Sequence, residues 1–164
     1  GIAQRAQGKL DEAYDNFYRA TWDHAFHSAA YYQLAELSCQ RGNYEDALEQ
    51  INHALRTNTL DTKALNVKAA ILRKLGKPKQ SAMIAQRVVK IDSLDFLGYN
   101  ELILAARELK QTKKANNAAR KLRKLMRDEV QSYLTMGMDY MNCGLWEEAI
   151  DVLTRPIESQ MEFA

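Results

Sequence analysis

The sequence contains few of the residues that interrupt helices. Only 7 of its 164 residues are glycine and 2 are proline, and both types mark the tight turns that a many-stranded sheet needs in number. Residues that favour helices, such as Ala, Leu, Lys, Glu and Gln, are abundant instead. The composition therefore predicts an all-α chain.

Long apolar runs and paired cysteines are also missing. No uninterrupted apolar run approaches the roughly 18 residues that a membrane span requires, and the chain does not open with a signal-like segment. The two cysteines, Cys39 and Cys143, are too far apart in sequence for a disulfide framework or a zinc motif. These features favour a soluble protein without a membrane span in a reducing compartment, the cytoplasm.

Acidic residues are nearly absent from one segment. The whole chain has a formal net charge of +2, but residues 107–127 contain nine Lys or Arg residues and one acidic residue, Glu108. The side chains expected on the outer face of this helical segment are Lys113, Lys114, Arg120, Lys121 and Lys124. Such a row can bind nucleic-acid phosphates. Without interleaved aromatic residues, a solvated outer helix face is the simpler interpretation.

A 34-residue period runs through the chain. Gly8, Gly42 and Gly76 are 34 residues apart, and Gly144 follows 68 residues later. Three further sets of residues recur at the same 34-residue spacing: one of small residues, one of mostly large apolar residues and one of Tyr or Leu. They consist of Ala13, Ala47, Ser81, Ala115 and Ala149; of Phe17, Ile51, Ala85, Ala119 and Leu153; and of Tyr31, Leu65, Tyr99 and Tyr133. Several columns in one register indicate a structural repeat.

Each period predicts two helices with apolar residues on one face. The expected helices are 1–7 and 11–22, then 28–41 and 45–55, 62–75 and 79–91, 96–109 and 112–126, and 130–143 and 147–155. Pro156 is expected to end the last helix near Arg155. Because no helix pair covers its own apolar face, the pairs should stack. We expect a single right-handed α-α solenoid over 1–164, with a partial repeat at 1–27 and repeats at 28–61, 62–95, 96–129 and 130–163.

The repeat resembles a known family. The residues that carry the resemblance are Gly42-Asn43-Tyr44-Glu45-Asp46-Ala47, followed by Ile51 and Ala54, with similar segments at 144–149 and 8–13. They resemble the tetratricopeptide repeat, over one partial and four full repeats. The proline that ends the family's pattern is absent, and the fourth repeat lacks its glycine. The first repeat is truncated and no polar capping helix is expected after the last, so we expect an excerpt of a larger protein. Residues 22–102 are also similar to repeat segments of large bacterial multidomain proteins.

The resemblance implies a concave groove, lined by the first helix of each pair, that binds a protein or peptide. The family's concave positions correspond here to Tyr32, Glu36, Gln40, Asn66, Arg73, Lys74, Asn100, Leu104, Arg107, Leu134, Met138 and Met141. Asn66 and Asn100 suit recognition of a backbone amide, since Asn both donates and accepts. Met138 and Met141 are adaptable apolar contacts or pack against a further repeat. The subtype that clamps chaperone tails has Asn where this chain has Glu36 and Ala70, which argues against that partner.

No group of residues predicts catalysis, a cofactor or a metal site. His24 and His27 share metal-ligand spacing, but no cysteine lies near them. Cys39 and Cys143 are three repeats apart, so the expected stacking would keep their thiols far from each other. Gly76 is followed by Lys77 and Pro78 without the other glycines of a phosphate loop.

Three functions remain after these exclusions. The first is a non-enzymatic scaffold that binds a protein or peptide in its concave groove. The second is a structural or regulatory arm of a larger multidomain enzyme, with the groove filled by another part of the same chain. The third is nucleic-acid binding by the basic outer face.

Overall fold

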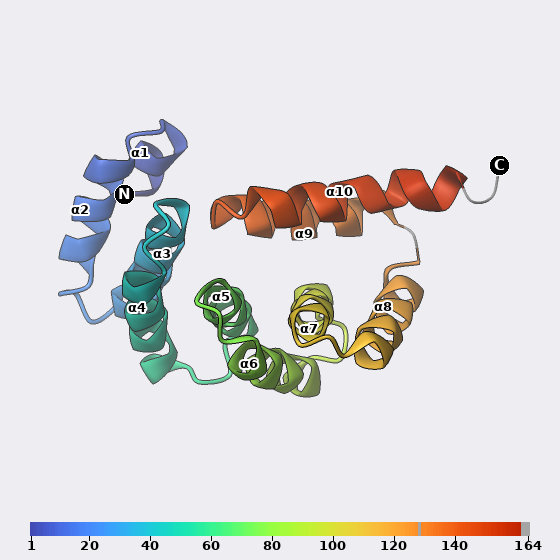
Figure 1. Ribbon diagram of the computed structural model, residues 1–164. Coiled ribbons are helices and arrows are strands. Elements are labelled where there is room, and N and C mark those ends of the chain that lie inside the picture. Colours follow the sequence, from blue (N-terminus) through green and yellow to red (C-terminus); the bar gives the residue numbers. More distant parts are fainter. Residues whose placement is uncertain (128, 162–164) are drawn as a thin grey trace.

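All regular structure in the described part of the chain is helical. The computed structural model describes residues 1–127 and 129–161, and these contain helices and no strand. In chain order the helices are α1 (Ile2–Ala6), α2 (Leu10–Ala20), α3 (His27–Gln40), α4 (Tyr44–Thr57), α5 (Thr62–Lys74), α6 (Pro78–Ile91), α7 (Phe96–Glu108), α8 (Thr112–Met126), α9 (Val130–Asn142) and α10 (Trp146–Met161) (Figure 1). The predicted all-α fold class is confirmed.

The glycines of the period hold the turns inside the helix pairs. Gly8, Gly42, Gly76 and Gly144 have φ angles between 67° and 75°, in the left-handed region that residues with a Cβ atom disfavour. Lys110 occupies the glycine position of the fourth repeat and adopts the same conformation, with φ 56°. The turn geometry therefore persists where the glycine is missing.

The turns between repeats follow the same period. Asp61 and Asp95 precede α5 and α7, and each accepts a hydrogen bond from the backbone three residues later, at 3.1 Å from Ala64 and at 2.7 Å from Gly98. Caps of this kind satisfy a backbone donor that the first helical turn leaves open. Consequently α5 and α7, each the first helix of its pair, begin at the same position of the repeat.

The small-residue column lies in the closely packed interior. Ala13, Ala47 and Ser81 are completely buried, and Ala115 and Ala149 nearly so. The helices of each pair pack on each other, and successive pairs stack through contacts of α4 with α5 and of α6 with α7. From α3 to α8 the chain therefore forms an arc of stacked pairs whose first helices, α3, α5 and α7, share the inner face (Figure 1).

The last helix pair lies across this arc. Helix α9 packs on α10 and contacts α3 and α7. Figure 1 shows the pair spanning the inner side of the arc, from α3 toward α8. This placement differs from the regular stacking expected of residues 130–163. The predicted helix end near Arg155 is also wrong, because α10 continues to Met161.

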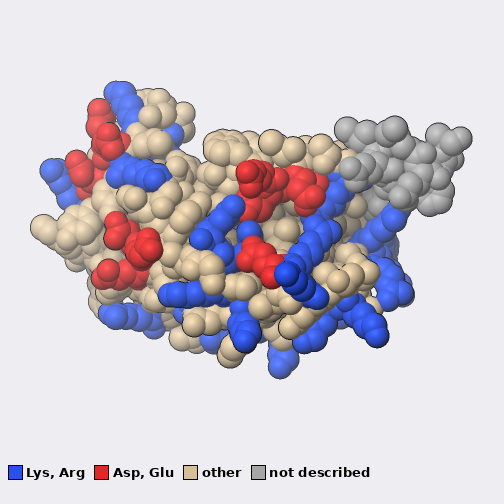
Figure 2. Space-filling model, in the orientation of Figure 1, with Lys and Arg blue, Asp and Glu red and all other residues tan. Residues whose placement is uncertain are grey.

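Helix α8 is therefore the terminal helix of the stack. Stacking a further pair on α8 would require an apolar face, but the exposed residues of α8 are mostly charged. The Lys and Arg side chains at the right of Figure 2 lie over this helix. A solenoid needs a polar surface at its end, and the basic segment supplies it.

The close approach of α3 and α4 gives a stability test. Ala47→Leu should overpack this fully buried site and lower the free energy of unfolding by about 1–3 kcal/mol, measured by urea denaturation. The control is Ala29→Leu, the same change at an exposed position of α3, which should alter it by less than about 0.5 kcal/mol. Equal effects of the two changes would contradict the register of the repeat.

Candidate functional site

The C-terminal end of α9 is fixed to the beginning of the arc. The backbone carbonyl of Asn142 accepts hydrogen bonds from Gln40 Nε2 at 2.8 Å and from Arg5 Nη2 at 2.9 Å. A Cβ atom on Gly144 would lie 2.9 Å from Gln40 Cα, so the absence of a side chain permits this approach. The hairpin of α9 and α10 is thus held directly against α1 and α3.

A buried ion cluster joins the hairpin to the middle of the arc. Arg73 of α5 donates from Nε to Glu101 of α7 at 3.0 Å and from Nη2 to Glu148 of α10 at 2.9 Å. Lys74 also pairs with Glu148, at 2.7 Å. The side chain of Glu101 is fully buried, and that of Arg73 is 6% exposed. Because removing one member would leave a buried charge unpaired, these helices depend on one another.

Tyr140 of α9 extends the cluster. Its hydroxyl donates to Glu101 Oε1 at 2.7 Å and accepts from Asn100 Nδ2 at 2.7 Å. Burial raises the pKa of Tyr140 well above its usual value, and the charge of Glu101 raises it further. Burial alone would lower the pKa of Arg73, but Glu101 outweighs it and the pKa is raised. The hydroxyl therefore keeps its proton and the guanidinium keeps its charge.

A second ion pair lies between α1 and α3. Arg5 contacts Glu36 at 2.5 Å, and the Glu36 side chain is 5% exposed. Burial raises the pKa of Glu36, while Arg5 acts in the opposite direction. Burial and then the charge of Glu36 raise the pKa of the neighbouring Tyr32. Like the Arg73 cluster, this pair is satisfied inside the chain.

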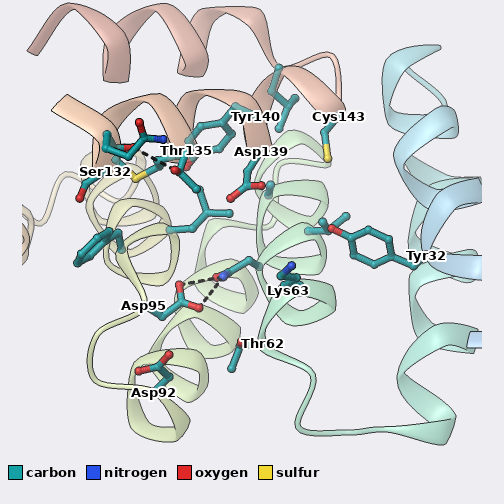
Figure 3. A pocket seen from close by; sticks show the side chains of 18 of the residues that line it. Tyr32, Thr62, Lys63, Asp92, Asp95, Ser132, Thr135, Asp139, Tyr140 and Cys143 are labelled. Atoms are coloured by element: carbon teal, nitrogen blue, oxygen red, sulfur yellow. Dashed lines mark hydrogen bonds between the residues drawn. The ribbon is translucent and has the colours of Figure 1, made fainter. Parts of the chain in front are cut away.

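A cavity of about 420 Å³ remains between α9 and the inner face of the arc. Its walls come from α3, α5, the turn before α7, the start of α7, and α9. In Figure 3 the carboxyl group of Asp139 points from α9 toward Asp95, and Lys63 lies at the side of α5. Phe96 and Met136 contribute apolar surface. The size lies within the usual range for ligand pockets.

Half of the predicted groove residues already bind other parts of the chain. These six are Glu36, Gln40, Asn66, Arg73, Lys74 and Asn100. Asn66 and Tyr32 also line the cavity, whereas half-buried Leu104 and exposed Arg107 of α7 do not. Partner binding by these residues stays a prediction, but most of them do not face an open groove.

The groove residues predicted on α9 lie on its outer surface. Leu134, Met138 and Met141 are 44%, 59% and 38% exposed. They do not line the cavity, and their contact with a partner stays a prediction, while α9 presents another face to the arc. That face includes Met136 and Tyr140, which are buried against the inner helices.

Cys39 and Cys143 are neighbours, contrary to the prediction that they lie far apart. Both thiols are free and buried within one core cluster. A hydrogen bond with Cys39, followed by burial, raises the pKa of Cys143 well above its usual value. Regular stacking would have separated them, but the hairpin returns to α3. A buried thiol that keeps its proton is a poor nucleophile, so the environment of Cys143 does not activate it.

The histidines take structural or exposed positions. His27 Nδ1 lies 2.8 Å from the backbone carbonyl of Thr21, and His24 is exposed. Within residues 1–127 and 129–161, no three or more His, Cys, Asp or Glu side chains are placed to hold a metal ion. In the same residues, no helix is long and apolar enough to cross a membrane.

Several residues of the cavity were not predicted as site residues. Asp95 was recognisable only as part of the repeated turn between helix pairs, and Lys63 as a residue of the first turn of α5. Asp139 has no counterpart in the family's concave positions. Its place opposite Asp95 follows from the position of the hairpin, which the 34-residue period does not specify.

The ion cluster predicts that replacing Arg73 lowers the free energy of unfolding far more than replacing the arginine at the same position of the next repeat. Arg73→Met should lower the free energy of unfolding by about 3–5 kcal/mol, because Glu101 and Glu148 would lose their shared cation. Arg107 lies 34 residues later, at the same repeat position, and is exposed. Arg107→Met should therefore cost less than about 0.5 kcal/mol. Chemical denaturation measures both, and comparable losses would contradict the role assigned to the cluster.

Comparison with known proteins identifies the repeat and the fold. Residues 4–71 match the model of the Tetratricopeptide repeat family. No curated protein matches the sequence. The chain is similar in structure to MamA from Desulfovibrio magneticus RS-1, with a TM-score of 0.73, 20% identity and coverage of 98% of this chain and 91% of that one.

Two further solved structures have the same fold. YrrB, described as a TPR protein with an unusual peptide-binding site, has a TM-score of 0.67 and 17% identity, covering 96% of this chain and 81% of its own. A tetratricopeptide repeat protein from Parabacteroides merdae ATCC 43184 has a TM-score of 0.74 and 18% identity, covering 96% of this chain and 62% of its own. Residues 4–71 therefore belong to the tetratricopeptide repeat family, and the described chain as a whole has the fold of that family.

Proposed function

We propose that this chain is a non-enzymatic protein-interaction scaffold whose partner binds at the cavity between α9 and the first helices. The fold supports a scaffold, because stacked repeats present extended surfaces that proteins use for binding. YrrB, a structural neighbour, is described as having a peptide-binding site. The proposal rests on the cavity, which stays open at the inner face where the α9–α10 hairpin covers the remainder of that face.

The walls of the cavity favour a peptide or protein segment as the occupant. They combine apolar side chains from α5, α7 and α9 with polar groups from α5, α9 and the turn before α7. This mixture is typical of sites that bury part of a ligand and fix its orientation by a few hydrogen bonds. The hydroxyl of Thr135 is already bonded to the backbone carbonyl of Gln131 at 3.0 Å, so this exposed residue can be enlarged without removing a contact to the arc.

The second candidate is a structural or regulatory arm of a larger enzyme, with its groove filled by its own chain. The position of the α9–α10 hairpin across the inner face favours it. Nucleic-acid binding by the basic face of α8 has less support. Arg120 bonds to Asn117 and Lys121 lies over the ring of Tyr99, and the position of α8 at the end of the stack accounts for its exposed charge.

A matched pair of threonine variants tests the scaffold proposal. Thr135→Trp should fill the mouth of the cavity and abolish capture of the partner by the immobilised chain from a lysate of its source cells. Thr154→Trp is the control, because Thr154 is an exposed residue of α10 with the same hydroxyl bond to the backbone four residues earlier. Circular dichroism should show unchanged helicity in both variants, and mass spectrometry identifies the captured proteins.

The outcomes separate the three functions. Loss of a protein from the Thr135→Trp sample alone supports binding at the cavity. Capture of the same proteins by both variants would place the partner elsewhere and overturn the proposed site. If none of the samples retains a protein, the arm is favoured, and nuclease-sensitive capture by both variants would favour nucleic acid.

A further inference from the structure

The cavity between α9 and the inner face carries an excess of acidic groups. Its lining includes the carboxyl groups of Asp92, Asp95, Glu129 and Asp139, and the single ammonium group of Lys63. The four acids come from the turn before α7, the residue before α9, and α9 itself. Hydrogen bonds and ion pairs within the chain decide which of these acids remain available to a ligand.

Two of the acids already stabilise the local backbone. Asp95 accepts two hydrogen bonds from Asn66 Nδ2, at 2.9 and 3.1 Å, and one from the Gly98 amide. Asp92 accepts from the Leu94 amide at 2.9 Å. These bonds hold Asp92 and Asp95 in place but leave acceptor capacity, since an ionised carboxylate accepts about four hydrogen bonds.

Asp139 has no such partner. Within residues 1–127 and 129–161 its exposed side chain makes no hydrogen bond and no ion pair, and its carboxyl group points into the cavity in Figure 3. Desolvation by the surrounding walls raises the pKa of Asp139, the charge of Lys63 lowers it, and that of Asp95 raises it again. A cation placed between Asp139 and Asp95 would relieve both the desolvation and the repulsion.

A buried amide oxygen in the same wall also lacks a donor. Asn66 is 3% exposed, and both of its hydrogen bonds to Asp95 use its nitrogen. Its Oδ1 atom is buried and has no hydrogen-bond partner. A buried acceptor without a donor is costly, and Asn66 lines the cavity, so a donor that reaches this oxygen would be stabilised there.

The carboxylates and the Asn66 oxygen supply acceptors, and apolar side chains line the cavity beside them. Val67, Phe96, Leu97 and Met136 line it beside the acids, and this surface suits an aliphatic chain. A bare metal ion does not fit, since the described residues contain no three or more His, Cys, Asp or Glu side chains placed to bind one. An anion would meet the carboxylates directly.

We propose that the cavity binds a basic side chain of the partner protein, with the ammonium or guanidinium group between Asp139 and the Asp95–Asn66 pair. The aliphatic stem of the lysine or arginine would lie against Phe96 and Met136. Charge-assisted hydrogen bonds to carboxylates are the strong ones in proteins, and they would give the site its selectivity. This inference rests on the proposed function and names the chemistry of the partner.

Small probes test the chemistry without knowledge of the partner. The probes are n-butylammonium and n-propylguanidinium, which reproduce the ends of Lys and Arg side chains, and n-butanol as the neutral control. In a ¹⁵N-labelled chain, both cations should shift the amide resonances of Asp95, Phe96 and Asp139 saturably. Butanol should bind at least about tenfold more weakly, because it cannot form a charge-assisted hydrogen bond.

A pair of aspartate variants separates the site from general attraction of cations. Asp139→Asn should weaken n-butylammonium binding about fivefold, in keeping with one partly exposed ion pair. Asp46→Asn removes the same charge from an exposed position of α4 and should leave the affinity unchanged. Equal binding of butanol, equal effects of the two variants, or the absence of saturable shifts would each overturn the proposal.

The probe experiment tests the basic side chain and the capture experiment tests the location of the partner, so either proposal can be rejected without the other. If Thr135→Trp loses the partner but the cations do not bind, the cavity remains the partner site and the basic side chain is rejected. If the cations bind in a manner that depends on Asp139 while capture is unaffected by Thr135→Trp, the acidic site stands and the proposed location of the partner is rejected.

Discussion

The buried ion cluster around Arg73 joins the last helix pair to the middle of the arc. A guanidinium group that is 6% exposed bridges Glu101 of α7 and Glu148 of α10, and Tyr140 of α9 bonds to the same Glu101. Because an unpaired buried charge is costly, removing the hairpin from the arc would leave the members of this cluster without partners. The cluster thus fixes the hairpin on the inner face, where a partner of a regular tetratricopeptide repeat array would have access.

This arrangement changes what the fold can offer a partner. The wide groove implied by the family resemblance is replaced by a smaller cavity, whose walls include both the arc and α9. A partner that needs a long open groove would have to displace the hairpin and break the Arg73 cluster. A partner that inserts one side chain would not, and for that reason we propose the cavity as the binding site.

The sequence predicted the helices and turns well and the position of the hairpin not at all. The glycine column and the repeated turns fix local geometry, because left-handed turns and aspartate caps depend on residues close in sequence. The contacts of Arg73 with Glu148 and of Gln40 with Asn142 join residues 75 and 102 positions apart, and a 34-residue period contains no information about them. The sequence held one indication that the last pair does not stack regularly, because the basic face of α8 is poorly suited to packing against another helix pair.

The central claim is that the end of α9 lies against α3, and proton–proton contacts test it most directly. Gly144 lies against Gln40 in the structure, so the account predicts nuclear Overhauser effects between the α-protons of Gly144 and the side-chain protons of Gln40. Regular stacking of a fifth repeat would place these residues three repeats apart. If contacts between Gly144 and Gln40 are absent while contacts between α8 and α9 are strong, the hairpin stacks regularly and the account is wrong.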